Sequence, residues 1–130
     1  IIIINNVFSG LEPLLIEFGV DVVIWAHEHS YERSWPLYDN VVYNGTEGPY
    51  INPGAPVHIV TGSAGCQEST DPFNYPAAAW SAFRSTDYGY TRFKAYNQTH
   101  IYFEQVSVDR KGKVIDSLWI EKHKHEAYNL

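Results

Sequence analysis

Two histidines separated by one residue, His27 and His29, are the residues whose types and spacing point most directly to chemistry. Imidazole is the most common protein ligand of transition metals, and it suits zinc and iron alike. In an extended segment, side chains two positions apart lie on the same face, so both rings can be directed at one point. By type and spacing the pair is either two metal ligands or two loop or core histidines that are satisfied by hydrogen bonds.

The elements that must position this pair are a helix and a strand. Residues 20–25 form an apolar, largely β-branched run after a turn signal at Gly19, which predicts a buried strand. Before it, apolar residues recur at helical spacing up to Phe18, and Ser9 with Glu12 matches a capping box at the helix start. A helix followed by a strand is typical of the end of a βαβ unit, which favours a parallel or mixed sheet. Active sites of such sheets lie at the carboxyl ends of strands, where the histidines are expected.

The rest of the chain is expected to be rich in strands and loops. The expected strands after the histidines are residues 41–43, 57–61, 88–96, 99–106 and 113–120. The last three alternate apolar and polar residues and are separated by short turns, which predicts an antiparallel meander. Residues 62–79 are expected to be irregular, and the polar tail after Ile120 is expected to fray. The predicted fold class is α/β.

Composition limits the classes of protein that this chain can represent. Its 130 residues suit one domain, and a formal net charge of −6 without a basic run disfavours nucleic acid and anionic membranes as partners. Residues 1–4 are four isoleucines, too few to span a bilayer and without the basic region of a signal peptide. They are expected to form a buried central strand. Because the chain contains no methionine, it is expected to be a fragment of a longer protein whose upstream part is missing.

Several residues suggest modification. Asn44-Gly45-Thr46 and Asn97-Gln98-Thr99 are sequons in turn-like contexts, so surface N-glycosylation and a secreted or lysosomal protein are expected. Cys66 is the single cysteine. It either pairs with a cysteine in the missing upstream part or remains a buried free thiol.

Other polar residues near the histidines, or of the same type, leave alternatives open. Tyr31, Glu32 and Arg33 either orient the histidines as hydrogen-bonding neighbours or serve a plain ion-pairing and packing role. Glu28, between the histidines, is expected to have a structural or solvent-facing role, because alternate side chains of an extended segment point apart. His58 lies inside an apolar strand and is expected to be a hydrogen-bonded core residue, whereas His123 and His125 are expected to be surface histidines without a role.

The same residues, taken with their surroundings, resemble a known family. The segments that carry the resemblance are residues 10–15, 20–36, 53–66, 71–73 and 87–90, including Ala-His-Glu-His-Ser-Tyr-Glu-Arg and Gly-Ser-Ala-Gly-Cys. They resemble purple acid phosphatases of the long-form animal type, within the calcineurin-like metallophosphoesterase superfamily. The resemblance implies that residues 1–130 are the C-terminal part of a single catalytic domain, a β-sandwich flanked by helices that ends in an antiparallel β-meander. Ala26 stands where the family usually has glycine, a change that is harmless where φ is negative and unfavourable where φ is positive.

The resemblance also implies a chemistry. In this family a dinuclear centre of Fe(III) with Fe(II), Zn(II) or Mn(II) hydrolyses phosphate monoesters by attack of a metal-bound hydroxide. Carried over, His27 would bind the divalent metal and His29 the ferric iron. The family's remaining ligands come from upstream motifs that this chain lacks, so no catalytic residue is assigned here and the fragment alone is expected to be inactive. The alternatives are another metallophosphoesterase, such as a nucleotidase or phosphodiesterase, and a non-catalytic glycoprotein that retains the fold.

Overall fold

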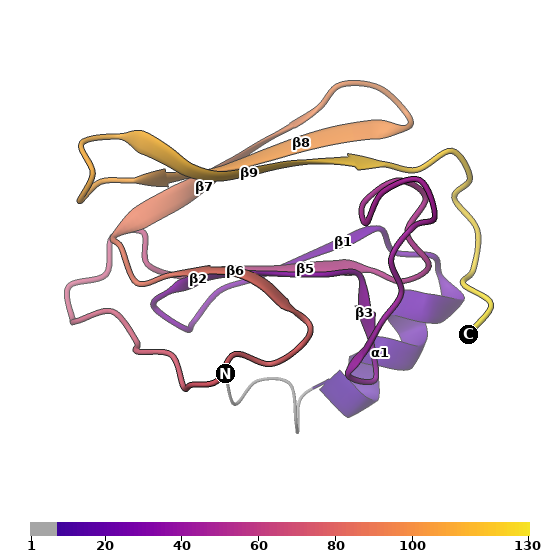
Figure 1. Cartoon of the computed structure of the whole chain (residues 1–130), viewed down its shortest axis with the longest axis horizontal. Helices are drawn as coiled ribbons and strands as arrows, with labels where there is room; N and C mark the ends of the chain where they lie inside the picture. The colour runs from indigo at the N-terminus through magenta and orange to yellow at the C-terminus, as the bar shows by residue number, and fades with distance from the viewer. Residues whose placement is uncertain (1–7) are drawn as a thin grey trace.

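The computed structural model describes residues 8–130, which form one helix and nine strands (Figure 1). The elements are α1 (Phe8–Glu17), β1 (Val22–Trp25), β2 (Tyr31–Ser34), β3 (Leu37–Tyr38), β4 (Val41–Val42), β5 (Val57–Thr61), β6 (Ser81–Ser85), β7 (Gly89–Ala95), β8 (His100–Ser107) and β9 (Lys113–Glu121). The strand expected at residues 1–4 lies outside the described residues. In the described part of the chain, no helix is long and apolar enough to cross a membrane.

Two sheets face each other, and α1 lies on the far side of the larger one (Figure 1). The larger sheet has the strand order β1-β5-β2-β6, and the smaller has the order β7-β8-β9. β1 pairs with β5 in parallel, whereas β2 pairs antiparallel with both β5 and β6. The prediction of a mixed sheet followed by an antiparallel meander is therefore confirmed, and β3 with β4 adds a short hairpin.

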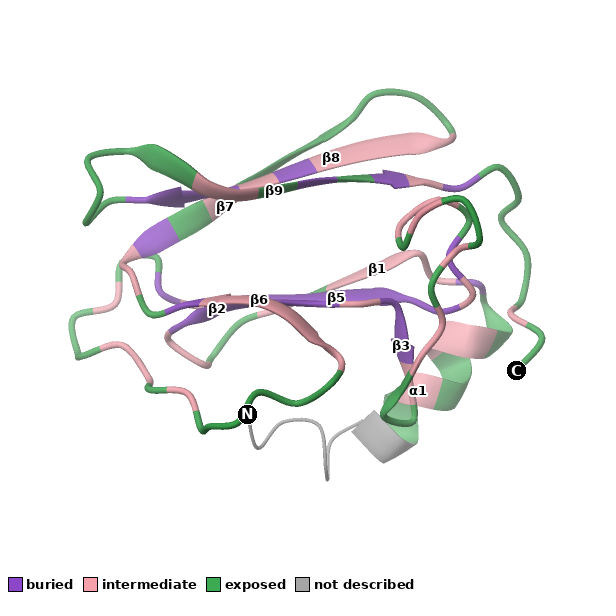
Figure 2. Ribbon diagram, in the orientation of Figure 1, coloured by how far each residue is buried: buried purple, intermediate pink, exposed green. Residues whose placement is uncertain are grey.

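The hydrophobic core fills the space between the two sheets, where Figure 2 shows buried residues on the facing strands. Its buried members come from β2, β5, β8 and β9: Tyr31, Val57, Ile59, Phe103, Leu118 and Ile120. Residues at alternate positions of one strand point to the same side of a sheet, which explains why Val57 and Ile59 both reach this core. Burial of such side chains is the main favourable contribution to the stability of the layered fold.

Strand β2 was not predicted from the sequence. All four of its residues are buried, although they include Glu32 and Arg33. β2 is a strand because it lies between β5 and β6 and is hydrogen-bonded to both. Arg33 is paired with Asp116 on β9, whereas only one carboxylate oxygen of Glu32 has a hydrogen-bond partner among the described residues. β3 and β6 were likewise not predicted from the sequence.

The C-terminal tail is fixed to the rest of the molecule, so the prediction that it frays is wrong. Lys122 is buried, and its ammonium group lies 3.5 Å from an Asp21 carboxylate oxygen. The ring of His125 contacts the other Asp21 oxygen at 2.8 Å, so this histidine is not a surface residue without partners. The Tyr128 amide donates to the Ile16 carbonyl oxygen at 3.0 Å, which attaches the tail to α1.

Candidate metal centre

His27 and His29 lie at the carboxyl end of β1, in a bend formed by residues 27–30. Since β1 and β5 are parallel, the loop that follows β5 leaves the sheet at the same edge. This location agrees with the sequence prediction, but the local conformation differs. The segment is not extended, because the Ser30 amide donates to the Glu28 carbonyl oxygen at 2.8 Å and closes a tight turn.

His27 adopts the left-handed backbone conformation, with φ of 80°. A non-glycine residue held in such a sparsely populated region costs about 1–3 kcal/mol, and such residues cluster at functional sites. Ala26 is not among the residues with positive φ, so alanine in place of the family's glycine introduces no strain there. The His27 side chain is exposed, and neither of its ring nitrogens forms a hydrogen bond within residues 8–130. Both nitrogens therefore remain available to a ligand.

The backbone of His29 is held by Asp71, a residue 42 positions later in the chain. The His29 amide donates to the Asp71 carboxylate at 2.6 Å, and the Asp71 amide donates to the His29 carbonyl oxygen at 3.1 Å. A hydrogen bond to a charged acceptor is short and strong compared with a neutral one. Asp71 was not recognised as a site residue from the sequence, although it lies in one of the segments that carry the family resemblance.

The ring of His29 is oriented by Cys66. The Cys66 sulfur lies 3.1 Å from Nδ1 of His29, and its thiol donates to the Glu68 carbonyl oxygen at 3.2 Å. With the thiol hydrogen used in this way, the sulfur can accept a hydrogen bond from Nδ1, and in that tautomer Nε2 keeps a lone pair for a metal. Cys66 is half-buried and forms no disulfide within residues 8–130. A disulfide with a cysteine outside this range stays a prediction.

The loop after β5 packs against the histidine bend through Gly62. A Cβ atom at this position would lie 2.1 Å from the Glu28 carbonyl oxygen and 3.2 Å from the His27 amide nitrogen. Only glycine permits this approach, and the Gly62 amide donates to the Ser30 carbonyl oxygen at 3.2 Å. The backbone of residues 27–30 is therefore enclosed by the segment from Gly62 to Asp71.

Tyr31 and Arg33 bind Asp116 on β9. The Arg33 guanidinium makes two hydrogen bonds to the Asp116 carboxylate, at 2.7 and 2.9 Å, and the Tyr31 hydroxyl donates to the same group at 2.9 Å. Burial lowers the pKa of Arg33, but the hydrogen bond to Asp116 and the neighbouring charges outweigh this and raise it, so the guanidinium stays charged. Burial also raises the pKa of Tyr31 well above its ordinary range.

Glu32 points to the opposite face of the sheet, where its carboxylate accepts a hydrogen bond from the Ser81 hydroxyl at 2.6 Å. Burial raises the pKa of Glu32. Of the two roles that the sequence left open for Tyr31, Glu32 and Arg33, these contacts match ion pairing and packing. Orientation of the histidines by these three residues stays a prediction.

His58 stabilises the end of β1 from the neighbouring strand. The Trp25 indole donates to Nδ1 of His58 at 3.0 Å, and the two rings are nearly parallel with centroids 6.0 Å apart. Burial lowers the pKa of His58 to about 4, so the ring is neutral at physiological pH. The prediction of a hydrogen-bonded core histidine is confirmed, and its partner directly precedes the histidine bend.

The arrangement fits part of a metal centre. Within residues 8–130, no group of three or more histidine, cysteine, aspartate or glutamate side chains is arranged to hold a metal ion by itself. His27 and His29 nevertheless offer two imidazoles from one enclosed bend, and imidazole nitrogen is a ligand of both zinc and iron. The described residues can therefore offer two imidazoles to such a centre.

Comparisons with known proteins relate this chain to a family. Residues 55–117 match the family described as iron/zinc purple acid phosphatase-like protein C. The chain is 61% identical over 117 residues to acid phosphatase type 7 of Danio rerio, covering 89% of this chain and 26% of the relative. It is 54% identical over 112 residues to the human protein of the same name, covering 85% of this chain and 26% of the relative.

A solved structure shows the same fold. The purple acid phosphatase from yellow lupin seeds (Lupinus luteus) superimposes with a TM-score of 0.76 at 30% identity, over 86% of this chain and 19% of that protein. The predicted α/β fold class is thereby confirmed. This chain spans about a quarter of the length of the animal relatives that it matches. It belongs to the purple acid phosphatase family and corresponds to the C-terminal portion of its members.

Proposed function

We propose that the parent protein hydrolyses phosphate monoesters at a dinuclear metal centre to which His27 and His29 contribute two ligands. The observation that carries this proposal is the enclosed bend after β1, where Asp71 and Cys66 fix His29 and where His27 leaves both ring nitrogens unengaged within residues 8–130. Similarity to proteins named acid phosphatases supports the reaction class. The remaining ligands would come from the upstream part of the parent.

The proposed metals are Fe(III) together with Fe(II), Zn(II) or Mn(II). When bound, a metal pair polarises a phosphate ester and lowers the pKa of water to near neutrality. The residues of this chain would hold the His29 imidazole in place before any metal arrives, whereas for His27 they fix the backbone and leave the ring unengaged within residues 8–130. The Asp71 bonds fix the backbone of His29, and the Cys66 contact at Nδ1 leaves Nε2 as the ring nitrogen that would bind a metal. His27 would bind the divalent metal and His29 the iron.

The test is replacement of each ligand in the full-length parent. His27→Ala and His29→Ala are each expected to abolish phosphatase activity and to lower the metal content measured by elemental mass spectrometry. His123→Ala is the matched control, because His123 is an exposed histidine whose ring hydrogen-bonds only to Glu121 among the described residues. Near-normal turnover of either ligand variant would refute the assignment.

The same preparation separates the alternatives. A parent that cleaves phosphate diesters or nucleotides faster than simple monoesters would be a phosphodiesterase or nucleotidase with this fold. A parent that binds no metal after gentle purification would be a non-catalytic glycoprotein. Metal content therefore decides between catalysis and its absence, and the substrate profile decides between the enzyme classes.

We also propose that Asn44 and Asn97 carry N-linked glycans and that the parent follows the secretory route to the lysosome or the cell exterior. Both asparagines are exposed, and each is followed by threonine two positions later. Mass spectrometry of glycopeptides from the secreted parent tests this assignment. Unmodified asparagine at both positions would contradict it.

A further inference from the structure

The outer face of the β7-β8-β9 sheet carries a cluster of rings, here named the outer aromatic patch: Tyr96, His100, Tyr102 and Trp119. The ring centroid of Trp119 lies 4.7 Å from that of Tyr96, 5.0 Å from that of Tyr102 and 6.4 Å from that of His100. Tyr96 is 52% exposed and Trp119 is 48% exposed. Aromatic side chains usually bury most of their large apolar area, so this half-exposed cluster is a surface that a ligand can cover.

The strand register explains why these rings point away from the core. Tyr102 and Trp119 are paired across β8 and β9, and the adjacent pair is Ile101 with Ile120. The two isoleucines pack in or against the core between the sheets. Because neighbouring residues of a strand point to opposite sides, Tyr102 and Trp119 must face outward. The face opposite to the core therefore combines these rings with charged side chains of β7 and β8, among them Lys94, whose ammonium lies 4.4 Å from the centroid of the Tyr96 ring.

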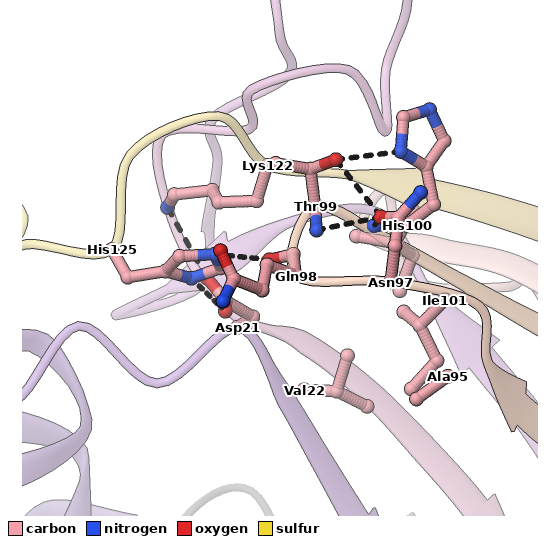
Figure 3. Close-up of a pocket in the computed structure, with 11 residues that line it drawn as sticks. Asp21, Val22, Ala95, Asn97, Gln98, Thr99, His100, Ile101, Lys122 and His125 are labelled. Carbon is pink, nitrogen blue, oxygen red and sulfur yellow. Dashed lines mark hydrogen bonds and ion pairs between the residues drawn. The ribbon is translucent and has the colours of Figure 1, made fainter.

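A glycosylation sequon begins at the edge of this patch. Asn97 directly follows Tyr96, in the turn between β7 and β8. Its side-chain oxygen accepts hydrogen bonds from the Thr99 amide at 2.8 Å, the Thr99 hydroxyl at 3.0 Å and the His100 amide at 2.9 Å. These bonds fix the carboxamide and leave its nitrogen, the atom that a glycan modifies, free of them. Figure 3 shows the Asn97 carboxamide beside His100, a member of the patch.

We propose that the outer aromatic patch is the binding surface for the first sugars of an N-glycan attached to Asn97. This inference rests on the glycosylation proposed above. The apolar face of an N-acetylglucosamine ring presents C–H groups that pack well against the π-faces of Tyr96 and Trp119. Since the first sugar is attached to the residue next to Tyr96, contact with the patch requires little additional ordering, which favours it over a separate ligand.

The second sequon supplies an internal comparison. Asn44 also follows a tyrosine, Tyr43, but within residues 8–130 Tyr43 stacks on no other aromatic ring. Tyr43 is also half-buried, because its Cβ packs close to Gly54. A glycan at Asn44 would therefore find no aromatic surface of comparable extent. The two sites share the same sequence pattern and differ in what surrounds them.

The first measurement is hydroxyl-radical labelling of the glycosylated parent protein. Untreated protein is compared with protein trimmed by endoglycosidase to one N-acetylglucosamine and with protein from which an amidase removes the whole glycan. The amidase leaves aspartate at position 97, whose side-chain oxygens can still accept the bonds from Thr99 and His100. Labelling of Trp119 and Tyr96 is expected to be low in the first two forms and severalfold higher in the third. Labelling of Tyr43 is expected to change little.

The second measurement is thermal stability, which tests energetic coupling between the glycan and the patch. Asn97→Gln is expected to lower the melting temperature of the parent, and the same change in a Trp119→Thr background is expected to lower it much less. Threonine suits a strand, so Trp119→Thr preserves the meander. Asn44→Gln in both backgrounds is the control and is expected to show no such coupling.

Each contrary outcome is distinct. Equal labelling of Trp119 in all three forms, with Asn97 fully modified, would overturn the binding surface and leave the glycosylation intact. Low labelling in all forms would show that another part of the parent covers the patch. An unmodified Asn97 peptide in the mass spectrum would overturn both glycosylation at this site and the inference, without bearing on phosphatase activity.

Discussion

Removal of the Asp116 carboxylate is expected to destabilise the fold strongly, because Arg33 would remain as an unpaired buried charge. The two side chains are 10% and 7% exposed, and the guanidinium makes two bonds to the carboxylate. Breaking a buried ion pair by removing one partner costs about 3–5 kcal/mol. Asp116→Ala also removes the acceptor of the Tyr31 hydroxyl, so we expect a loss in the upper half of that range.

The assay is urea denaturation followed by circular dichroism, with a matched pair on the same sheet as control. Arg92 and Glu104 form an ion pair in which the Arg92 side chain is 55% exposed. Such a surface pair contributes about 0–1 kcal/mol, so Glu104→Ala is expected to lower the free energy of unfolding only slightly. If Asp116→Ala lost no more than Glu104→Ala, the account of a desolvated Arg33 would be refuted.

A double substitution separates the lost pair from the stranded charge. In Arg33→Met with Asp116→Leu, both charges are replaced by apolar groups, and such replacements are often neutral. We therefore expect the double variant to be more stable than Asp116→Ala alone. An additive loss, with the double variant less stable than either single variant, would show that packing around the pair matters more than its charge.

Three further expectations concern the histidines. Asp71→Ala is expected to weaken metal retention of the dialysed parent, whereas Asp71→Asn keeps an acceptor for the His29 amide and should retain metal; equal metal contents would contradict this. Burial lowers the pKa of His58 from 6.5 to about 4, so between these pH values the unfolded state binds more protons than the folded state. Stability should therefore fall as the pH drops from 6.5 to 4. His58→Gln should reduce this dependence of the melting temperature on pH. The pKa of His125 is shifted in the opposite direction, because hydrogen bonds to Gln98 and Asp21 raise it. Its contribution to stability should be present below pH 6.5 and lost as the pH rises through the raised pKa. His125→Ala should abolish this loss of stability.

Periodic segments could be predicted from the sequence because their burial follows a simple pattern. The expected strands at residues 20–25, 57–61 and 113–120 correspond to β1, β5 and β9 with shifts of at most two residues. β2 could not be predicted in this way, since Glu32 and Arg33 are residue types usually found at the surface. The partner of Arg33 is 83 positions away, and no local pattern shows that the two meet.

The same distinction between local patterns and contacts of distant residues applies to the candidate site. The type and spacing of His27 and His29 indicated metal ligands, and their place after a strand was correct. The left-handed conformation of His27 depends on the enclosing loop, which the sequence alone does not show. Asp71 accepts a hydrogen bond from the His29 backbone amide. No sequence spacing marks a carboxylate with this role, so Asp71 could not be recognised from the sequence.

The fold fixes both ends of β1, the strand that leads into the two proposed ligands. At the start of the strand, Asp21 contacts Lys122 and His125 of the C-terminal tail. At its end, Trp25 binds His58 on β5, directly before the histidine bend. Ligands that are held by such contacts lose little conformational entropy when a metal binds, so the fold would increase the affinity for the metal by preorganisation. The tail contacts the end of β1 opposite to the proposed ligands, so we expect that loosening it would increase the mobility of the bend without removing a ligand.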